Sequence, residues 1–258
     1  FALPSAIYWL HMLFFSGVLY SLAFFINNRP GGSAAQFGFV TLFLYGSGLL
    51  SAPLAGRLID RFEPRTISIL ALTGSLAGAL LFVGIKVDTP LWVVITITCV
   101  LGFSMGANTP SIMKMAFSAV PPQKMGAGTG LFSMFRDLGS PTGSSLALAV
   151  FGATLAHQTR ASLQQHGAPA GLDPQTIDAL TRFAGSRSQI LPTDLSARVA
   201  AHGVEAQSLL HQASRDGLET ALTNVGYLLT TMIGFALLLA LRLRRRAAAS
   251  ARSATAPR

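Results

Sequence analysis

Six stretches of this sequence contain no Asp, Glu, Lys or Arg and are each long enough to cross a lipid bilayer. A transmembrane helix needs about 20 predominantly apolar residues to span about 30 Å of hydrocarbon. The stretches are Phe1 to Asn28, Phe37 to Gly56, Thr66 to Ile85, Pro90 to Met113, Leu138 to Ala156 and Thr220 to Leu241. The sequence therefore predicts an all-α integral membrane fold, a bundle of six transmembrane helices.

Composition supports this interpretation. Of 258 residues, 51% are hydrophobic and 11% are charged, whereas soluble domains average about 25% charged residues. The alternative is a soluble all-helical protein with unusually apolar helices. The presence of six such long charge-free runs argues against it. The single Cys99 excludes a disulfide framework and any Cys-based zinc or iron–sulfur site.

The formal charge of +9 is distributed as a topological signal, which argues against a nucleic-acid partner. The loops and tail on one side of the predicted membrane carry eleven basic residues: Arg57, Arg61, Arg65, Lys114, Lys124, Arg242, Arg244, Arg245, Arg246, Arg252 and Arg258. The two short loops on the other side carry only Arg29 and Lys86. Because basic residues near span ends stay cytoplasmic, both ends of the chain are expected in the cytoplasm of an inner (plasma) membrane.

The predicted organisation has four parts. Residues 1–156 hold five transmembrane helices, and residues 157–219 form a long extracytoplasmic loop with two short amphipathic helices at the membrane surface, one within 173–183 and one after 192. Residues 220–241 are the sixth span, and 242–258 are a basic cytoplasmic tail beside anionic lipid. The chain begins at Phe1 without a basic segment before the first apolar run, so we expect further helices to precede it.

The segment between the second and third predicted spans, residues 56–65, concentrates charge at one end of the bundle. Gly56 allows close packing at a helix end, and Asp60 can accept hydrogen bonds from amides at the start of a neighbouring helix. Arg61 and Arg65 can pair with acids or with last-turn carbonyls. Such a cluster can hold helix pairs together in one conformational state. The alternative is a plain basic turn fixed by Pro64.

Residues 56–65 resemble the loop motif of the major facilitator superfamily, Gly-x-Leu-x-Asp-Arg-x-Gly-Arg-Arg/Lys, found after the second helix of each six-helix half. The matching residues are Gly56, Leu58, Asp60, Arg61 and Arg65. Glu63 and Pro64 depart from it, as is usual for the copy in the C-terminal half. The resemblance implies that the chain is the C-terminal six helices of a transporter and that the missing N-terminal helices of the same transporter are its partner.

A second stretch, residues 120–143, resembles the penultimate helix of the 14-helix drug:proton antiporters. In that family a Val-Pro turn precedes a Gly/Ala-rich helix start and an Arg-x-x-Gly-Gly-x-x-Gly run. Arg136, Gly139 and Gly143 fit the run, while Ser140 stands where a second Gly is common. Close approach of helices is expected at four glycines: Gly126, Gly130, Gly139 and Gly143.

Arg136 and Asp137 form the one charged pair that can lie within a predicted span, which makes them candidates for charge coupling. Arg136 can re-pair between inward-open and outward-open states, or it can snorkel and be satisfied by carbonyls. No lone carboxylate lies in the other five spans, so a proton-coupling acid belongs to the missing half or is Asp137.

Aromatic and polar residues of the first and fourth spans are candidates to line a cavity for bulky apolar cations. They are Tyr8, His11, Phe15 and Asn108. His11 is also a candidate proton-sensitive group. In the alternative, these residues face lipid or neighbouring helices. Asn108 and Thr109 precede Pro110, where a broken helix would free carbonyls toward the cavity.

Together these features predict a secondary active transporter that exports small hydrophobic compounds by alternating access, coupled to protons. The expected partners are membrane lipids and a small hydrophobic or cationic substrate. No cofactor, metal site or catalytic residue is predicted, and an intramembrane enzyme lacks a nucleophile. The alternative is an orphan or truncated half with a non-transporting scaffold role. The sequence does not specify the substrate, the coupling ion or its stoichiometry.

Overall fold

A computed structural model describes residues 1–29, 31–166, 175, 178–179 and 204–254. These residues form helices and connecting turns, with no strand in the described ranges. The helices are α1 (Ala2–Asn28), α2 (Ala34–Arg61), α3 (Pro64–Val83), α4 (Leu91–Phe117), α5 (Met125–His166) and α8 (Val204–Ala254), with the short 3₁₀ turn η1 (Pro122–Lys124) before α5. The expected all-α membrane fold is confirmed.

Local sequence signals set most of the helix boundaries. Ser33 caps α2, its Oγ accepting a hydrogen bond of 3.2 Å from the amide of Gln36. Pro64 occupies the first position of α3, where its missing N–H has no partner to lose. The turn before α2 contains Gly31, whose φ of 71° lies in the left-handed region that favours glycine.

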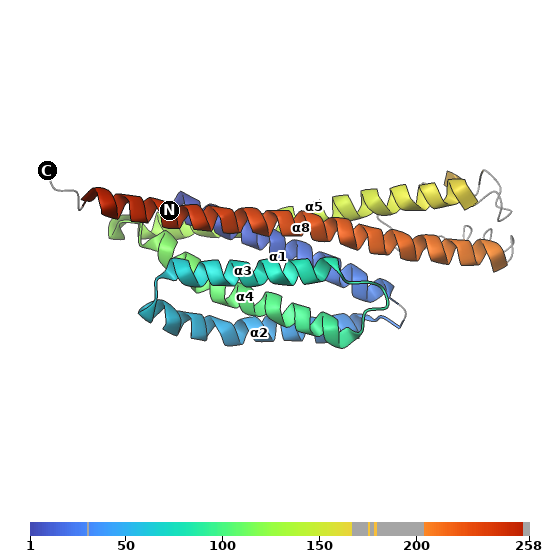
Figure 1. Ribbon diagram of the computed structural model, residues 1–258, viewed down its shortest axis with the longest axis horizontal. Coiled ribbons are helices and arrows are strands. Elements are labelled where there is room, and N and C mark those ends of the chain that lie inside the picture. Colours follow the sequence, from blue (N-terminus) through green and yellow to red (C-terminus); the bar gives the residue numbers. More distant parts are fainter. Residues whose placement is uncertain (30, 167–174, 176–177, 180–203, 255–258) are drawn as a thin grey trace.

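Figure 1 shows the helices running roughly along one axis in two groups that lie against each other. One group contains α2, α3 and α4, and the other contains α1, α5 and α8. Contacts of α3 with α8 and of α1 with α4 join the groups. The core between them is apolar and rich in aromatic side chains, with Phe14, Phe25, Phe82 and Phe151 almost completely buried.

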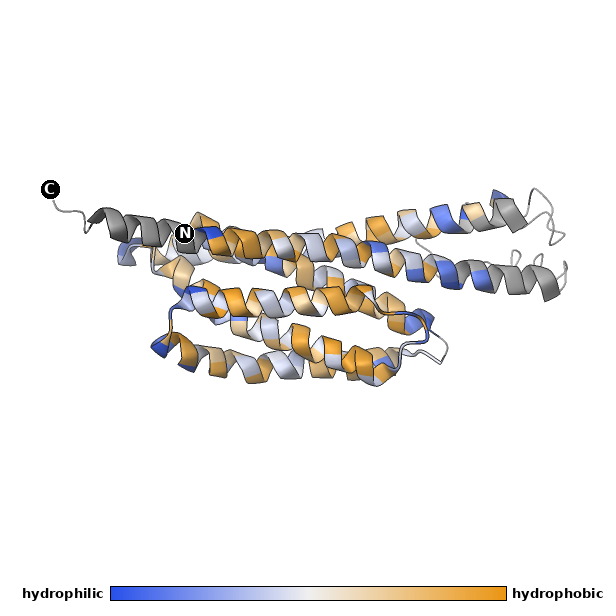
Figure 2. Cartoon of the chain, viewed as in Figure 1, coloured by the Kyte–Doolittle hydropathy of each residue, from blue (hydrophilic) through white to orange (hydrophobic). Residues whose placement is uncertain are grey.

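The turn between α2 and α3 and the segment between α4 and α5 lie at one end of the bundle, which we call the motif end (Figure 1). The turns α1–α2 and α3–α4 lie at the other, the opposite end. Figure 2 shows hydrophobic residues along the middle of the helices and hydrophilic residues at their ends. Such a distribution is favoured when lipid hydrocarbon surrounds the middle of a helix bundle and water surrounds its ends.

Within the described residues, five helical segments are long and apolar enough to cross a membrane: α1, α2, α3, α4 and residues 215–242 of α8. The predicted fifth span, 138–156, lies inside α5 and is not among them. Its first half is rich in Gly, Ser, Thr and Pro, which lowers its hydropathy. Its passage through the bilayer stays a prediction.

The helices α5 and α8 do not end where the sequence predicted. Residues 157–166 continue α5, so the predicted loop boundary at 157 is wrong as a helix end. Residues 204–219 are helical, as expected for the helix after 192, and continue into the last span without a break. Likewise the predicted tail from 242 is helical as far as Ala254. No Pro or Gly interrupts 157–166, and α8 tolerates Gly217. The helix expected within 173–183 falls almost entirely outside the described residues.

These two helices are longer than a membrane is thick. At 42 and 51 residues, α5 and α8 measure about 63 Å and about 76 Å, against about 40–45 Å for a bilayer with its headgroups. Figure 1 shows both projecting past the opposite end of the bundle, with residues 204–219 collinear with the span. The expectation that this part of α8 lies across the membrane surface is therefore not met.

Candidate functional site

The loop motif closes the motif end of the bundle through a contact that the sequence did not predict. Lys114, in the last turn of α4, donates from Nζ to the carbonyl of Ile59 (3.3 Å) and pairs with Asp60 Oδ1 (3.4 Å). Ile59 lies in the last turn of α2, where carbonyls lack helical partners and a positive charge is favoured. The partner of Asp60 is thus a basic side chain, that of Lys114.

The other motif residues take separate roles. Gly56 lies within α2, and a Cβ added there meets nothing within 4 Å, so the expected close packing is wrong. Leu58 packs beside a small buried cluster of Ala55, Ile59 and Ile67. Arg61, in the last turn of α2, is exposed.

Two open hollows flank the motif. One, of about 630 Å³, lies between the start of α1, the α2–α3 turn and the end of α4, and its charged lining residues are Glu63, Arg65 and Lys114. The other, of about 410 Å³, is lined by residues of α2 alone, Asp60 and Arg61 among them. The motif residues therefore separate two surface depressions at the motif end.

The charged pair that the sequence predicts within a span, Arg136 and Asp137, is exposed. Arg136 Nε donates to Asp137 Oδ1 at 2.9 Å, and the two side chains are 49% and 66% exposed. Exposed polar residues Thr129, Ser140 and Thr142 occur on the same half of α5. This half therefore presents an ion pair and hydroxyl groups at its surface.

The predicted packing glycines divide in two. A Cβ at Gly139 would lie 2.8 Å from Met12 Cβ and 2.9 Å from the Trp9 carbonyl oxygen, and one at Gly143 would collide with the Leu13 carbonyl. Close packing of α5 on α1 is confirmed at these two positions. At Gly126 and Gly130 a Cβ meets nothing within 4 Å, so the prediction is wrong there.

The residues predicted to line a cavity are buried between helices instead. Tyr8 stacks on Phe132 of α5 with ring centroids 5.0 Å apart, and Phe15 meets Tyr45 of α2 edge-on at 6.0 Å. Neither hollow at the motif end includes them. They are covered because α1 packs against α4, α5 and α8.

His11 and Asn108 belong to a buried polar network that links three helices. Asn108 Nδ2 lies 2.8 Å from His11 Nδ1, and His11 Nε2 lies 3.3 Å from Ser75 Oγ on α3. Ser68, also on α3, donates to Asn108 Oδ1 at 2.7 Å. All four side chains are at most 1% exposed. The helix around Asn108 is unbroken at Pro110, so the expected break is wrong.

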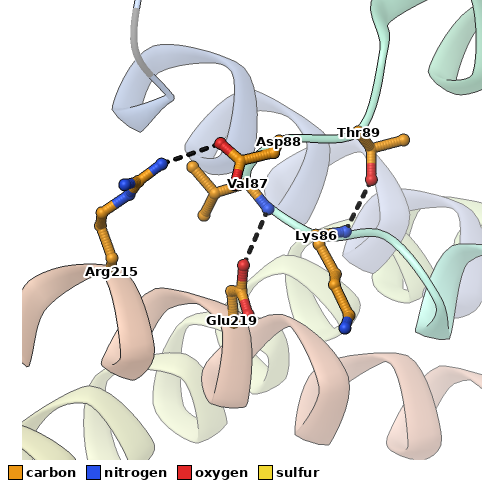
Figure 3. Close-up of polar contacts among 6 residues, drawn as sticks. All are labelled: Lys86, Val87, Asp88, Thr89, Arg215 and Glu219. Carbon is orange, nitrogen blue, oxygen red and sulfur yellow. Dashed lines mark hydrogen bonds and ion pairs between the residues drawn. The ribbon is translucent and has the colours of Figure 1, made fainter. Parts of the chain in front are cut away.

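Two neighbouring polar contacts fasten the opposite end (Figure 3). Arg215 and Glu219 both lie on α8. Arg215 Nη2 donates to Asp88 Oδ1 at 2.8 Å, and Glu219 Oε1 accepts from the amide of Val87 at 3.2 Å. Within the α3–α4 turn, the Lys86 amide donates to Thr89 Oγ1. The α3–α4 turn is thereby tied to α8.

The sequence of these long apolar helices, one of which ends in Gly-x-Leu-x-Asp-Arg, matches a known sequence profile. The profile of the Major Facilitator Superfamily matches residues 5–158, more than half of the chain. The chain belongs to the Major Facilitator Superfamily. It is therefore a multi-pass membrane protein of a transporter family rather than an enzyme.

Curated relatives within the Major Facilitator Superfamily have differing substrates. The chain is 27% identical to the riboflavin transporter RibZ of Clostridioides difficile over 55% of this chain and 31% of that protein. It is 28% identical to a tetracycline resistance determinant of Streptomyces rimosus, over 52% and 39%, and 28% identical to the multidrug resistance protein Stp of Mycobacterium tuberculosis, over 61% and 28%. The chain thus spans well under half the length of these relatives.

Sequence reasoning missed three residues of these superfamily helices. Lys114 served only as a topological marker, although a lysine ending one span beside an aspartate ending another is a complementary pair. Ser68 and Ser75 passed unnoticed among many small residues. Ser68 and Ser75 are seven residues apart and therefore lie on one face of α3. This spacing indicates a polar contact only once a polar residue of another helix is known to face them.

Proposed function

We propose that the chain is the C-terminal portion of a secondary transporter that exports small hydrophobic or cationic compounds, coupled to proton entry. Two relatives are by name a tetracycline resistance determinant and a multidrug resistance protein. The chain covers less than half of each relative, so the proposed activity requires the remaining helices of the same protein. The proposed location is the plasma membrane, with the motif end in the cytoplasm.

The observation that carries the proposal is the exposed ion pair on α5. Arg136 lies eleven residues into α5, about 16 Å from its start. An unpaired charge facing lipid at such depth costs about 3 kcal/mol or more. Because the pair is accompanied by exposed hydroxyl groups, this face of α5 suits a water-filled path between two transporter halves better than lipid.

In the proposed cycle, the two halves rock around a central binding region. Arg136 and Asp137 pair with each other when the path is open, and exchange this partner for groups of the other half when it closes. The Lys114 contact with Ile59 and Asp60 keeps α2 and α4 together as they move. The chain's share of the mechanism is to supply one wall of the path.

The test uses the full-length transporter in proteoliposomes with an imposed proton gradient. Efflux of a fluorescent cation and of riboflavin is measured in parallel, because one relative is a riboflavin transporter. Asp137→Asn is expected to lower gradient-driven efflux at least tenfold. Asp88→Asn is the matched control, because Asp88 forms an ion pair with Arg215 of similar length and exposure in an external turn, and it should stay within twofold.

Three results would contradict the proposal. Absence of gradient-driven movement for both compounds and for a wider panel of hydrophobic cations would remove proton-coupled export. Equal efflux for Asp137→Asn and the wild type would remove the assigned role of the α5 face. Efflux of riboflavin without efflux of any hydrophobic cation would contradict the proposed substrate class.

A further inference from the structure

The His11 network has one consistent placement of its protons in this conformation. The Asn108 Nδ2 group is a donor, so the His11 Nδ1 atom that it meets is an acceptor. The remaining ring nitrogen, Nε2, then carries the hydrogen that points to Ser75 Oγ. Ser68 donates to Asn108 Oδ1, which completes the chain of bonds. The imidazole is therefore neutral here.

Among the residues that the structure describes, none places a counter-charge beside an imidazolium at His11. The groups of α3 and α4 in the network are the Asn108 amide and the hydroxyl groups of Ser68 and Ser75, all of which are neutral. On α1 itself the neighbouring titratable group is Tyr8, and the charges that act on Tyr8 are Arg136 and Asp137 of α5. His11 is fully buried, and a charge buried without a partner is costly.

A proton on Nδ1 would also break the pattern of donors and acceptors. Nδ1–H would face the Asn108 amide N–H, so two donors would oppose each other. Rotation of the Asn108 amide by half a turn would bring Oδ1 to Nδ1–H and would turn Nδ2 toward the Ser68 oxygen. The network thus has a matched arrangement for either protonation state, and the protonated one holds a charge that this packing disfavours.

From this arrangement we infer that His11 is a binding site for the coupling proton, and that its occupation releases α1 from α3 and α4. A conformation that disfavours a proton is, by linkage, disfavoured when the proton binds. The network ties α1 in one helix group to α3 and α4 in the other. Protonation therefore loosens the junction between the two groups. The inference rests on the proposed function only where it assigns the bound proton to transport.

Transport measurements on the full-length protein separate proton drive from substrate passage. His11→Gln keeps a side-chain N–H for Ser75 but has no group that takes up a proton. It is expected to lower gradient-driven efflux at least tenfold while substrate counterflow, which needs no net proton movement, stays within threefold. Ser21→Ala is the matched control, because Ser21 is also a buried polar residue of α1 but donates to the Gly17 carbonyl of its own helix, and its driven efflux should stay within threefold.

A second readout does not depend on transport. Spin labels at Asn27 of α1 and Leu80 of α3, both exposed, report the distance between these helices after Cys99→Ser. In the wild type this distance should change between about pH 8 and about pH 5, and in His11→Gln it should not. A misfolded variant would be recognised by its elution profile, in which case His11→Asn takes its place.

The outcomes divide cleanly. A distance that ignores pH in the wild type, or a His11→Gln variant that keeps either response, overturns the inference even if the protein exports drugs. A pH-dependent distance that His11→Gln abolishes supports the proton site even if no tested compound is transported, in which case the proposed function fails alone.

Discussion

The glycines of α5 show how the position of a single residue on its helix decides its role. Gly139 and Gly143 face α1, where a Cβ would collide with backbone atoms, whereas Gly126 and Gly130 face open space. Thirteen residues separate Gly126 from Gly139, and at about 100° per residue this places them about 140° apart around the helix. The sequence supplies this difference in angle but not which of the two faces meets a neighbour.

Alanine substitutions should therefore separate the two pairs of glycines. Gly143→Ala is expected to destabilise the protein by at least about 2 kcal/mol, because the added methyl overfills the α1–α5 contact. Gly130→Ala should be neutral or stabilising by up to about 1 kcal/mol, since alanine favours the helix. Thermal unfolding in detergent measures both. Similar unfolding temperatures for the two variants would show that α1 and α5 are not in this close contact.

Asp60→Asn tests the motif at the same scale. Its ion pair with Lys114 is largely exposed, and such pairs contribute about 0–1 kcal/mol, so the unfolding temperature should change little. Efflux by the full-length protein should fall partly, because the contact biases one conformational state. In a double-mutant cycle, the loss for Asp60→Asn combined with Lys114→Met should be smaller than the sum of the two single losses. Fully additive losses would mean that the two residues act separately.

At the scale of helices, the sequence predicted the existence of the elements better than their ends. The runs free of charge located the first four spans because apolar length is a strong local signal. The extension of α5 was missed because polar residues such as those at 157–166 are compatible with a loop or a helix. The His11 network was hidden because its members are up to 97 residues apart.

Chemical cross-linking can test the contact between α8 and the α3–α4 turn. Cysteines replacing Asp88 and Arg215, in a Cys99→Ser background, should be joined by a short bismaleimide within one molecule, since the native side chains meet at 2.8 Å. Cysteines at Asp88 and Arg242 are the control, because Arg242 lies about 40 Å along α8 from Arg215. Equal cross-linking of both pairs would contradict a straight α8.

At the scale of the whole molecule, the two ends of the bundle differ in charge. Arg57, Arg61, Arg65, Lys114 and Lys124 lie at the motif end, whereas the α1–α2 and α3–α4 turns at the opposite end contribute Arg29 and Lys86. Chain connectivity alone puts the turns on alternating ends. The basic residues then predict which end faces the cytoplasm.

Accessibility to an impermeant thiol reagent tests this orientation. In a Cys99→Ser background, cysteine at Asp88 should be labelled in intact cells, and cysteine at Arg61 should be labelled only in inverted vesicles. Both positions are exposed, so a lack of reaction reports sidedness and not burial. The reverse pattern would place the motif end outside.

The close contacts at Gly139 and Gly143, and the similar ones of Gly102 and Gly106 of α4 against α2, constrain how the gene can vary. Every single-nucleotide change in a glycine codon that alters the amino acid introduces a side chain, and at these four positions a side chain collides with the neighbouring helix. No single-nucleotide substitution at these glycines is therefore expected to be neutral. Variants selected for a new substrate should therefore arise on other surfaces, while these two helix crossings are inherited unchanged.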